Sequence, residues 1–189
     1  MNLKNLQWAY TKDEVRNING ASKDEKYFLD FNLKIPLIYC KGEINKPYWR
    51  KEPNIHDDII REYFGNSESV EHYNTKMYFT YYKKLSYKKY VFKADSSKSE
   101  HYIKQINKII DVMFFDVNKE PLLGIEVYKT NKKTIQDINK FEKLNFPIYE
   151  YNYNTKKGEF ISFGGNGVAE TESIKGEIRR INKLISDIK

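Results

Sequence analysis

Two apolar segments, each interrupted by a single acidic residue, constrain the fold of this chain more than any other feature. They are residues 107–115, NKIIDVMFF, and residues 121–129, PLLGIEVYK, and the short segment DVNKE joins them. This spacing predicts two neighbouring strands in a hairpin. Because side chains alternate along a strand, Asp111 and Glu126 should lie on the face opposite the one that carries most of the apolar side chains.

Acidic residues embedded in apolar strands are usually paired or bind a metal ion, because an isolated buried carboxylate is costly. The pattern therefore favours a site at Asp111 and Glu126. It leaves a second interpretation open, in which the two carboxylates merely lie on a solvated face of the sheet.

The residues around this hairpin predict an α/β (α+β) domain with a mixed central sheet flanked by helices. Helical spacing of apolar residues and N-cap chemistry indicate helices after residue 66, over 134–144 and at the end of the chain, where isoleucines from Ile174 to Ile188 form one stripe. Residues 87–94 and 147–152 are expected to be strands, and Gly164–Gly167 a glycine-rich turn rather than a phosphate cradle.

The first part of the chain has a different pattern. Short aromatic runs separated by turn residues predict a small β-rich region over residues 1–60, followed by the main domain over residues 61–189. The single cysteine, Cys40, excludes an internal disulfide framework and a four-cysteine zinc site. With no apolar run near the ~20 residues that span a bilayer, we expect a cytoplasmic protein without a membrane segment.

The formal charge of +7 suits a polyanionic partner such as nucleic acid, although a solvated basic surface has the same composition. Lysines and aromatic residues alternate between Lys83 and Lys93. That segment either follows a phosphate backbone or is a strand with a solvated basic face.

Taken with their neighbours, these motifs resemble the PD-(D/E)XK nuclease superfamily, in its competence protein CoiA-like branch. Asp111 followed by GIEVY at 124–128 resembles the family's D…(D/E)-x-K core. Glu71-His72 with Lys76 resembles the branch's E-H-x-x-x-K helix, and LNFPIYE at 144–150 resembles its next strand. The resemblance implies a restriction-endonuclease-like fold and a metal-dependent nuclease that hydrolyses the phosphodiester bonds of DNA.

By this resemblance, Glu71, Asp111 and Glu126, with the carbonyl of Val127, hold one or two Mg²⁺ (or Mn²⁺) ions. The family's usual lysine is Tyr128 here, which can hydrogen-bond a water but carries no positive charge. Lys76 and Lys140 are candidates to replace it. Residues expected to contact DNA are His72, Lys88, Lys89 and Lys140.

The resemblance extends to the first 60 residues, where the branch usually carries a zinc-ribbon-like element. Leu29, Asn32, Tyr48 and Lys51 stand where the ligands would fall, so no zinc is expected. These losses and Tyr128 motivate an alternative, a catalytically inactive nuclease-fold protein that binds DNA or a protein partner. The oligomeric state stays open, a homodimer included.

Overall fold

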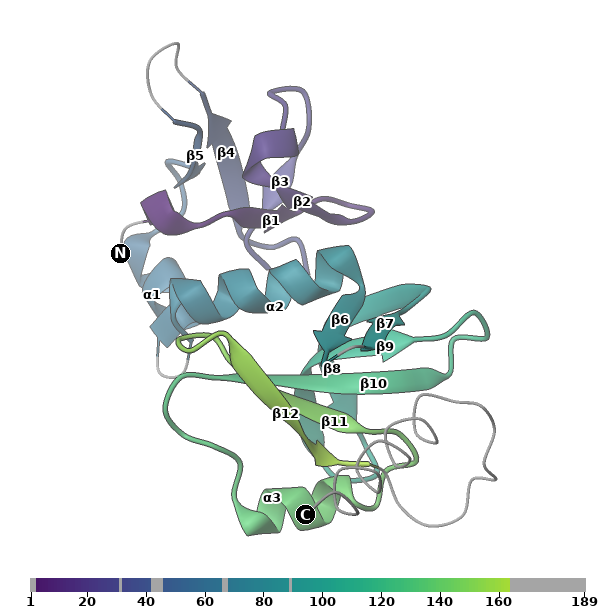
Figure 1. Ribbon diagram of the computed structural model, residues 1–189. Helices are drawn as coiled ribbons and strands as arrows, with labels where there is room; N and C mark the ends of the chain where they lie inside the picture. The colour runs from purple at the N-terminus through teal and green to yellow at the C-terminus, as the bar shows by residue number, and fades with distance from the viewer. Residues whose placement is uncertain (1–2, 31, 42–45, 66–67, 89, 164–189) are drawn as a thin grey trace. The chain divides into compact units, whose positions relative to one another are not determined.

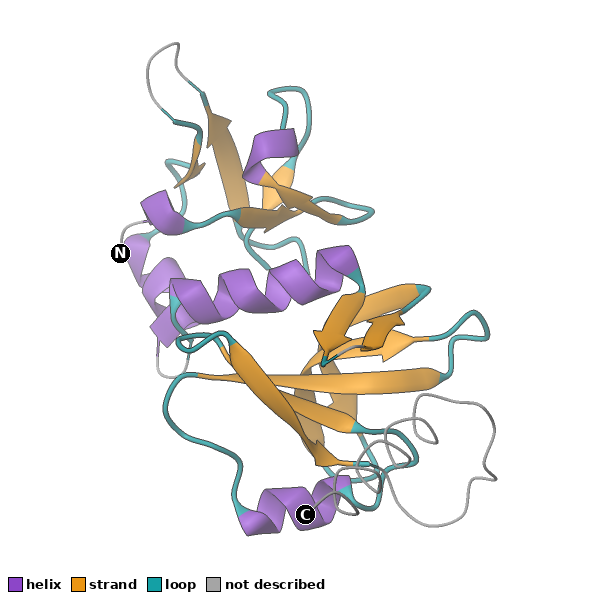
Figure 2. Ribbon diagram, viewed as in Figure 1, coloured by secondary structure: helices purple, strands orange, loops and turns teal. Residues whose placement is uncertain are grey.

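The structure is a computed structural model that describes residues 3–30, 32–41, 46–65, 68–88 and 90–163 (Figure 1). The chain divides into two compact units, Met1–Tyr82 (unit 1) and Lys83–Lys189 (unit 2). Each unit contains a five-stranded sheet, and both mix helices with strands (Figure 2). The predicted mixed α/β composition is therefore confirmed at this level.

The sheet of unit 1 is antiparallel throughout, with the strand order β2-β1-β3-β4-β5. Its strands are β1 (Trp8–Tyr10), β2 (Val15–Asn17), β3 (Tyr27–Phe28), β4 (Pro36–Cys40) and β5 (Tyr48–Lys51). Short 3₁₀ helices, η1 (Leu3–Asn5) and η2 (Ile18–Gly20), lie at its turns. Four of the five strands coincide with the aromatic runs of the sequence.

Two helices complete unit 1. They are α1 (Asp57–Gly65), which begins inside the region expected to be β-rich, and α2 (Val70–Tyr82). Tyr73 and Met77 of α2 are buried in one cluster with Trp8 and Trp49 of the sheet. The Tyr73 hydroxyl also donates to the carbonyl of Leu29 at 2.9 Å. The division into compact units falls at 82/83, because the buried side chains of α2 pack on the N-terminal sheet. The expected domain boundary at 60/61 stays a prediction.

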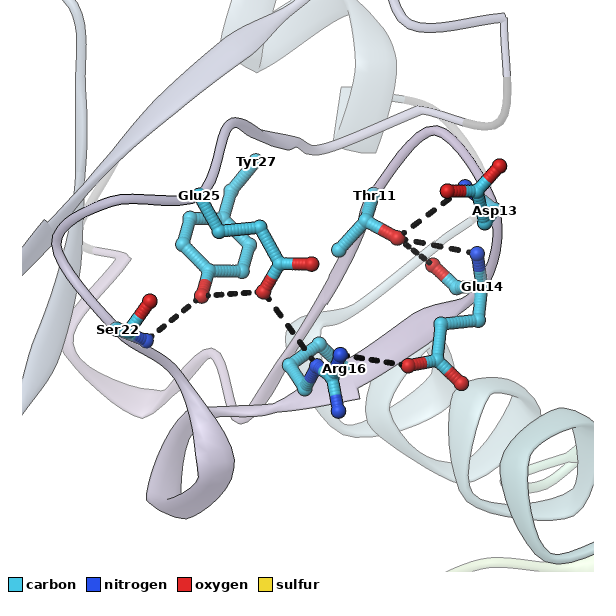
Figure 3. Close-up of polar contacts among 7 residues, drawn as sticks. All are labelled: Thr11, Asp13, Glu14, Arg16, Ser22, Glu25 and Tyr27. Carbon is cyan, nitrogen blue, oxygen red and sulfur yellow. Dashed lines mark hydrogen bonds and ion pairs between the residues drawn. The ribbon is translucent and has the colours of Figure 1, made fainter.

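A network of polar contacts holds the turns of unit 1 (Figure 3). The Thr11 hydroxyl accepts from the amide of Glu14 at 3.0 Å and donates to that residue's carbonyl. Arg16 lies between Glu14, at 2.6 Å, and Glu25, at 3.5 Å, and the Tyr27 hydroxyl donates to Glu25 at 2.9 Å. These polar side chains contact one another within the turns, so their role in unit 1 is structural.

The sheet of unit 2 is mixed, with the strand order β12-β11-β10-β9-β8 (Figure 1). Its strands are β8 (Ser96–Ile103), β9 (Lys108–Phe115), β10 (Pro121–Tyr128), β11 (Ile148–Asn152) and β12 (Lys157–Ser162). Strands β8, β9 and β10 are antiparallel neighbours, so the predicted hairpin is confirmed. Helix α3 (Ile135–Phe141) connects β10 to β11, which pairs with it in parallel.

The two faces of this sheet are covered differently. On one face, Phe141, Leu144 and Phe146 from α3 and the segment after it pack on Met113 and Ile148. On the other face lies a hairpin of β6 (Lys84–Tyr87) and β7 (Tyr90–Lys93), where a single strand over 87–94 was expected. Its Tyr87 ring meets Tyr149 and Phe160 edge-on, at 5.8 and 5.0 Å between centroids.

Helix α3 begins with a capping box, in which Thr134 and Asp137 each bond the other's backbone amide. The box fixes the end of the connection from β10, residues 129–134 (Figure 1). The predicted turn at Gly164–Gly167 and the predicted terminal helix lie outside the described residues. No helix in the described part of the chain is long and apolar enough to cross a membrane.

Candidate active site

Asp111 and Glu126, the two acidic residues of the predicted hairpin, lie on the central strands of unit 2. The register of β9 and β10 runs to the pair Val112–Ile125, so Asp111 and Glu126 occupy the next positions of the two strands. There the Asp111 side chain takes the place of a backbone acceptor: its Oδ2 accepts from the Val127 amide at 2.8 Å. The two predicted carboxylates are thus brought together by neighbouring strands.

Glu126 is buried, with only 2% of its surface exposed. Burial raises the pKa of Glu126, the negative charge of Asp111 raises it further, and Lys133 lowers it in part, so that it reaches about 8. One carboxylate oxygen, Oε1, has no hydrogen-bond partner among the described residues. A buried acceptor without a protein partner is unusual in a folded protein, so this oxygen is available to a bound group.

Lys133 supplies the positive charge nearest to this carboxylate. Its Nζ lies 2.7 Å from Oε2 of Glu126, and it comes from the connection between β10 and α3. Burial lowers the pKa of Lys133, but the charges of Glu126 and Asp111 outweigh burial and leave it raised. Lys133 is therefore held as an ammonium group beside the acidic pair.

A third buried carboxylate, Glu150, lies on the next strand. It is 1% exposed and pairs in register with Glu126 across the parallel strands β10 and β11. Its Oε1 accepts from the backbone amide of Lys133 at 2.7 Å. Glu150 thereby anchors the connection that carries the lysine, and Lys133 is held at both its backbone and its side chain.

The carbonyl of Val127 lies at the same place. In an extended strand the N–H and C=O of one residue point to the same side. Because the Val127 amide faces Asp111, its carbonyl faces the same side of β10. The Tyr128 carbonyl instead accepts from Tyr153, on the side of β11. Val127 thus directs a backbone oxygen to the side of β10 on which Asp111 lies, and its role as a metal ligand stays a prediction.

Glu71, the third expected carboxylate, belongs to unit 1. It is exposed in the first turn of α2, and its carbonyl accepts from the Thr75 hydroxyl. Its convergence with Asp111 and Glu126 stays a prediction.

Lys76 and His72 also lie on α2, in unit 1, and both are directed at Glu68. Lys76 is 3% exposed, and its Nζ lies 2.5 Å from Oε1 of Glu68. The half-buried His72 has its Nδ1 3.8 Å from the same oxygen. Lys76 is therefore paired within its own helix region, and the lysine that reaches Glu126 is Lys133.

The other expected residues lie in unit 2. Tyr128 is half-buried at the end of β10, two positions after Glu126 and hence on the same face. Lys140 is exposed in the last turn of α3, and Lys88 is exposed at the turn of the β6–β7 hairpin, 5.2 Å above the Tyr87 ring. Lys89 lies outside the described residues. DNA contacts at these lysines stay predictions.

The positions at which the sequence resemblance leads one to expect zinc ligands differ in their surroundings. Leu29 is fully buried in the core of unit 1, and Asn32 is exposed. Lys51 donates to the carbonyl of Ile55 at 2.5 Å and lies 3.3 Å from Asp57, so it ties β5 to the start of α1.

The acidic pair offers the donors that a hard divalent cation prefers, two carboxylates and a backbone carbonyl. The unpartnered Oε1 of Glu126 gives such a cation a place to bind. Within the described ranges, no group of three or more His, Cys, Asp or Glu side chains is arranged to hold a metal ion. Asp111, Glu126 and the Val127 carbonyl thus fit Mg²⁺ as a partial ligand set, which waters commonly complete.

Lys133 and Glu150 were not among the residues expected at the site. The alternation Ile148, Glu150, Asn152 could have placed Glu150 on the face of Glu126, once β11 was known to be parallel to β10. Lys133 directly precedes the Thr134 N-cap, which could have marked it as the end of a connection returning to the sheet. Its contact with Glu126 follows only from the three-dimensional path.

Comparisons of the chain with protein-family models, with curated proteins and with solved structures gave no match.

Proposed function

We propose that the chain is a metal-dependent nuclease that hydrolyses phosphodiester bonds of DNA, with a restriction-endonuclease-like unit 2. The observation that carries this proposal is the buried, unpartnered Oε1 of Glu126 beside Asp111. The strand arrangement of unit 2 supports it: the antiparallel strands β8, β9 and β10 are followed by helix α3 and by β11, which is parallel to β10.

Each protein group has a defined task in this proposal. Asp111, Glu126 and the carbonyl of Val127 would hold the Mg²⁺ ion, and the Val127 amide orients the Asp111 carboxylate. Bound there, the cation would polarise the phosphodiester and offset the charge of the transition state. In the reaction, the oxygen of a water forms a bond to phosphorus and one P–O ester bond breaks. The departing oxygen takes up a proton from solvent, and the attacking water releases one.

The test is cleavage of linear, circular and branched DNA with Mg²⁺ or Mn²⁺. Wild type should cut at least one of these substrates, and Glu126→Gln and Asp111→Asn should lower the rate by about 100-fold or more. Glu120→Gln is the matched control, because Glu120 is an exposed carboxylate in the turn between the same two strands. If wild type and Glu126→Gln are equally inert on every substrate with either metal, the enzyme proposal is wrong.

One observation favours a second candidate, a catalytically inactive nuclease-fold protein that binds DNA or a protein partner. Tyr128 occupies the strand position where the resemblance leads one to expect lysine, and it brings no positive charge to the site. This candidate predicts binding of DNA that weakens steeply with salt, without cleavage and without bound Mn²⁺. Saturable Mn²⁺ binding that is lost in Asp111→Asn would refute it.

A further inference from the structure

Tyr128 brings no positive charge to Glu126, but the ammonium group of Lys133 contacts the same carboxylate. We propose that Lys133, from the connection between β10 and α3, acts as the catalytic lysine of this site, contacting the attacking water and the scissile phosphate. The inference rests on the proposed nuclease function and assigns a role to a residue that the sequence motifs do not mark.

The geometry favours Lys133 over every other lysine considered. Its Nζ lies 2.7 Å from Oε2 of Glu126, whereas Oε1 of the same carboxylate is left for the cation. A group bound at Oε1 and an ammonium at Oε2 would lie on the two sides of one carboxylate. Lys76 is paired with Glu68, and Lys140 makes no ion pair with the described residues.

Lys133 is also held in place, which a catalytic group requires. Its backbone amide donates to the buried Glu150, and the next residue, Thr134, caps α3 in a reciprocal pair with Asp137. About a quarter of the Lys133 side chain is exposed, so the residue is not closed off from solvent. An exposed surface lysine would have neither support.

The chemistry requires one positive charge near the reacting atoms. As negative charge develops on the phosphate oxygens, an ammonium beside Glu126 stabilises it, and its N–H groups orient the water that attacks phosphorus. Lys133 gives up no proton in this role. The step consumes one water and yields a phosphate monoester and an alcohol.

The alternative explanation is that Lys133 only neutralises the buried Glu126. Four variants separate the two explanations: Lys133→Met, Lys133→Arg, Lys132→Met and the double variant Tyr128→Lys with Lys133→Met. Lys132 is the matched control, since it is the neighbouring lysine, 60% exposed and paired with Glu159 on β12. Tyr128→Lys restores an ammonium on the face of Glu126, two positions along the strand.

We expect Lys133→Met to lower kcat for DNA cleavage by about 100-fold or more with KM changed by less than about threefold. Lys132→Met should keep nearly wild-type kcat, and Lys133→Arg should be intermediate. The double variant should recover kcat by about tenfold or more over Lys133→Met, because the charge returns to the same carboxylate. Calorimetric Mn²⁺ binding by Lys133→Met should be as tight as in wild type or tighter, since a competing cation is removed.

Several outcomes would overturn the inference while leaving the nuclease intact. The first is a nearly wild-type kcat in Lys133→Met while Glu126→Gln is inert. The second is a loss of kcat in Lys132→Met equal to that in Lys133→Met. The third is loss of both kcat and Mn²⁺ binding in Lys133→Met, without recovery in the double variant. The last outcome would assign Lys133 a purely structural role. If wild type itself is inert, the proposed function fails, and the inference fails with it.

Discussion

Replacement of Glu126 by glutamine should change how the stability of unit 2 depends on pH in the absence of metal. The pKa of Glu126 is about 8 in the folded chain, against an ordinary value of 4.5. A proton therefore binds more tightly to the folded state than to the unfolded state. Between these two pH values the folded chain holds one proton more, so this group makes the unfolding free energy fall as pH rises.

The magnitude follows from the same two values. Their difference, at about 1.36 kcal/mol for each pH unit, corresponds to about 5 kcal/mol lost between pH 4.5 and pH 8. Below that window both states are protonated, and above it both are ionised, so the contribution is flat on either side. Glutamine has nearly the same shape and does not titrate. The effect of Lys133 needs no separate account, because it is already contained in the pKa of Glu126, which Lys133 lowers in part.

The measurement must report on unit 2. Both tryptophans, Trp8 and Trp49, lie in unit 1, so their fluorescence reports on the other sheet. Hydrogen exchange of amides in β9, β10 and β11, compared between wild type and Glu126→Gln in EDTA at several pH values from 5 to 8.5, isolates the relevant strands. The variant should gain stability relative to wild type by several kcal/mol across this range. A difference that is independent of pH would refute the assigned burial and charge of Glu126.

Three further predictions concern the framework of the two units. Gly158→Ala places a Cβ 2.5 Å from a backbone carbonyl of β11 and should destabilise unit 2 by about 1–3 kcal/mol, whereas Gly65→Ala, with open space at its Cβ, should change stability by less than about 1 kcal/mol in chemical denaturation. The pKa of Asp137 is lowered to about 2, mainly by its hydrogen bond to Lys108. Because solvent screens this ion pair, Asp137→Ala should cost only about 1 kcal/mol at pH 7, mostly through loss of the capping box. The cost should decrease as pH falls from about 4 to 2, and hydrogen exchange of α3 amides measures it. Asp30→Ala removes an acceptor of two backbone amides and should lower the unfolding free energy of unit 1 by about 1–3 kcal/mol, read by tryptophan fluorescence.

The hairpin of β9 and β10 was predictable because its pattern is local. Apolar alternation fixes the faces of both strands, and the short turn between them fixes their direction, so Asp111 and Glu126 follow as neighbours. Strand β8 was not predicted because SSKSEHYI has no apolar alternation, and its pairing with β9 determines its conformation. The prediction of a single strand at 87–94 was wrong for a related reason. The turn at Lys88 has a positive φ of 52°, and the local sequence lacks the glycine or asparagine that usually marks such a turn.

The extent of unit 1 and the contact between Lys133 and Glu126 could not be read from the sequence, for another reason. Helix α2 has apolar residues that fit either neighbour in the chain, and only packing on Trp8 and Trp49 assigns it to unit 1. The motif that the sequence resembles places lysine on the strand, two positions after Glu126, where alternation puts it on the same face. Lys133 reaches Glu126 from a connection, and nothing in its local sequence specifies how far that connection returns.

The position of a charge matters to a carboxylate more than the element that carries it. A lysine at 128 would reach Glu126 along the strand, held by the ladder of β10 and β11. Lys133 reaches the same carboxylate from outside the ladder, and its support therefore has to come from side chains. Glu150 binds its backbone amide, and the Thr134–Asp137 box fixes the residue after it. The buried Glu150 thus gives the connection an anchor in the sheet, which a lysine on the strand at position 128 would not need.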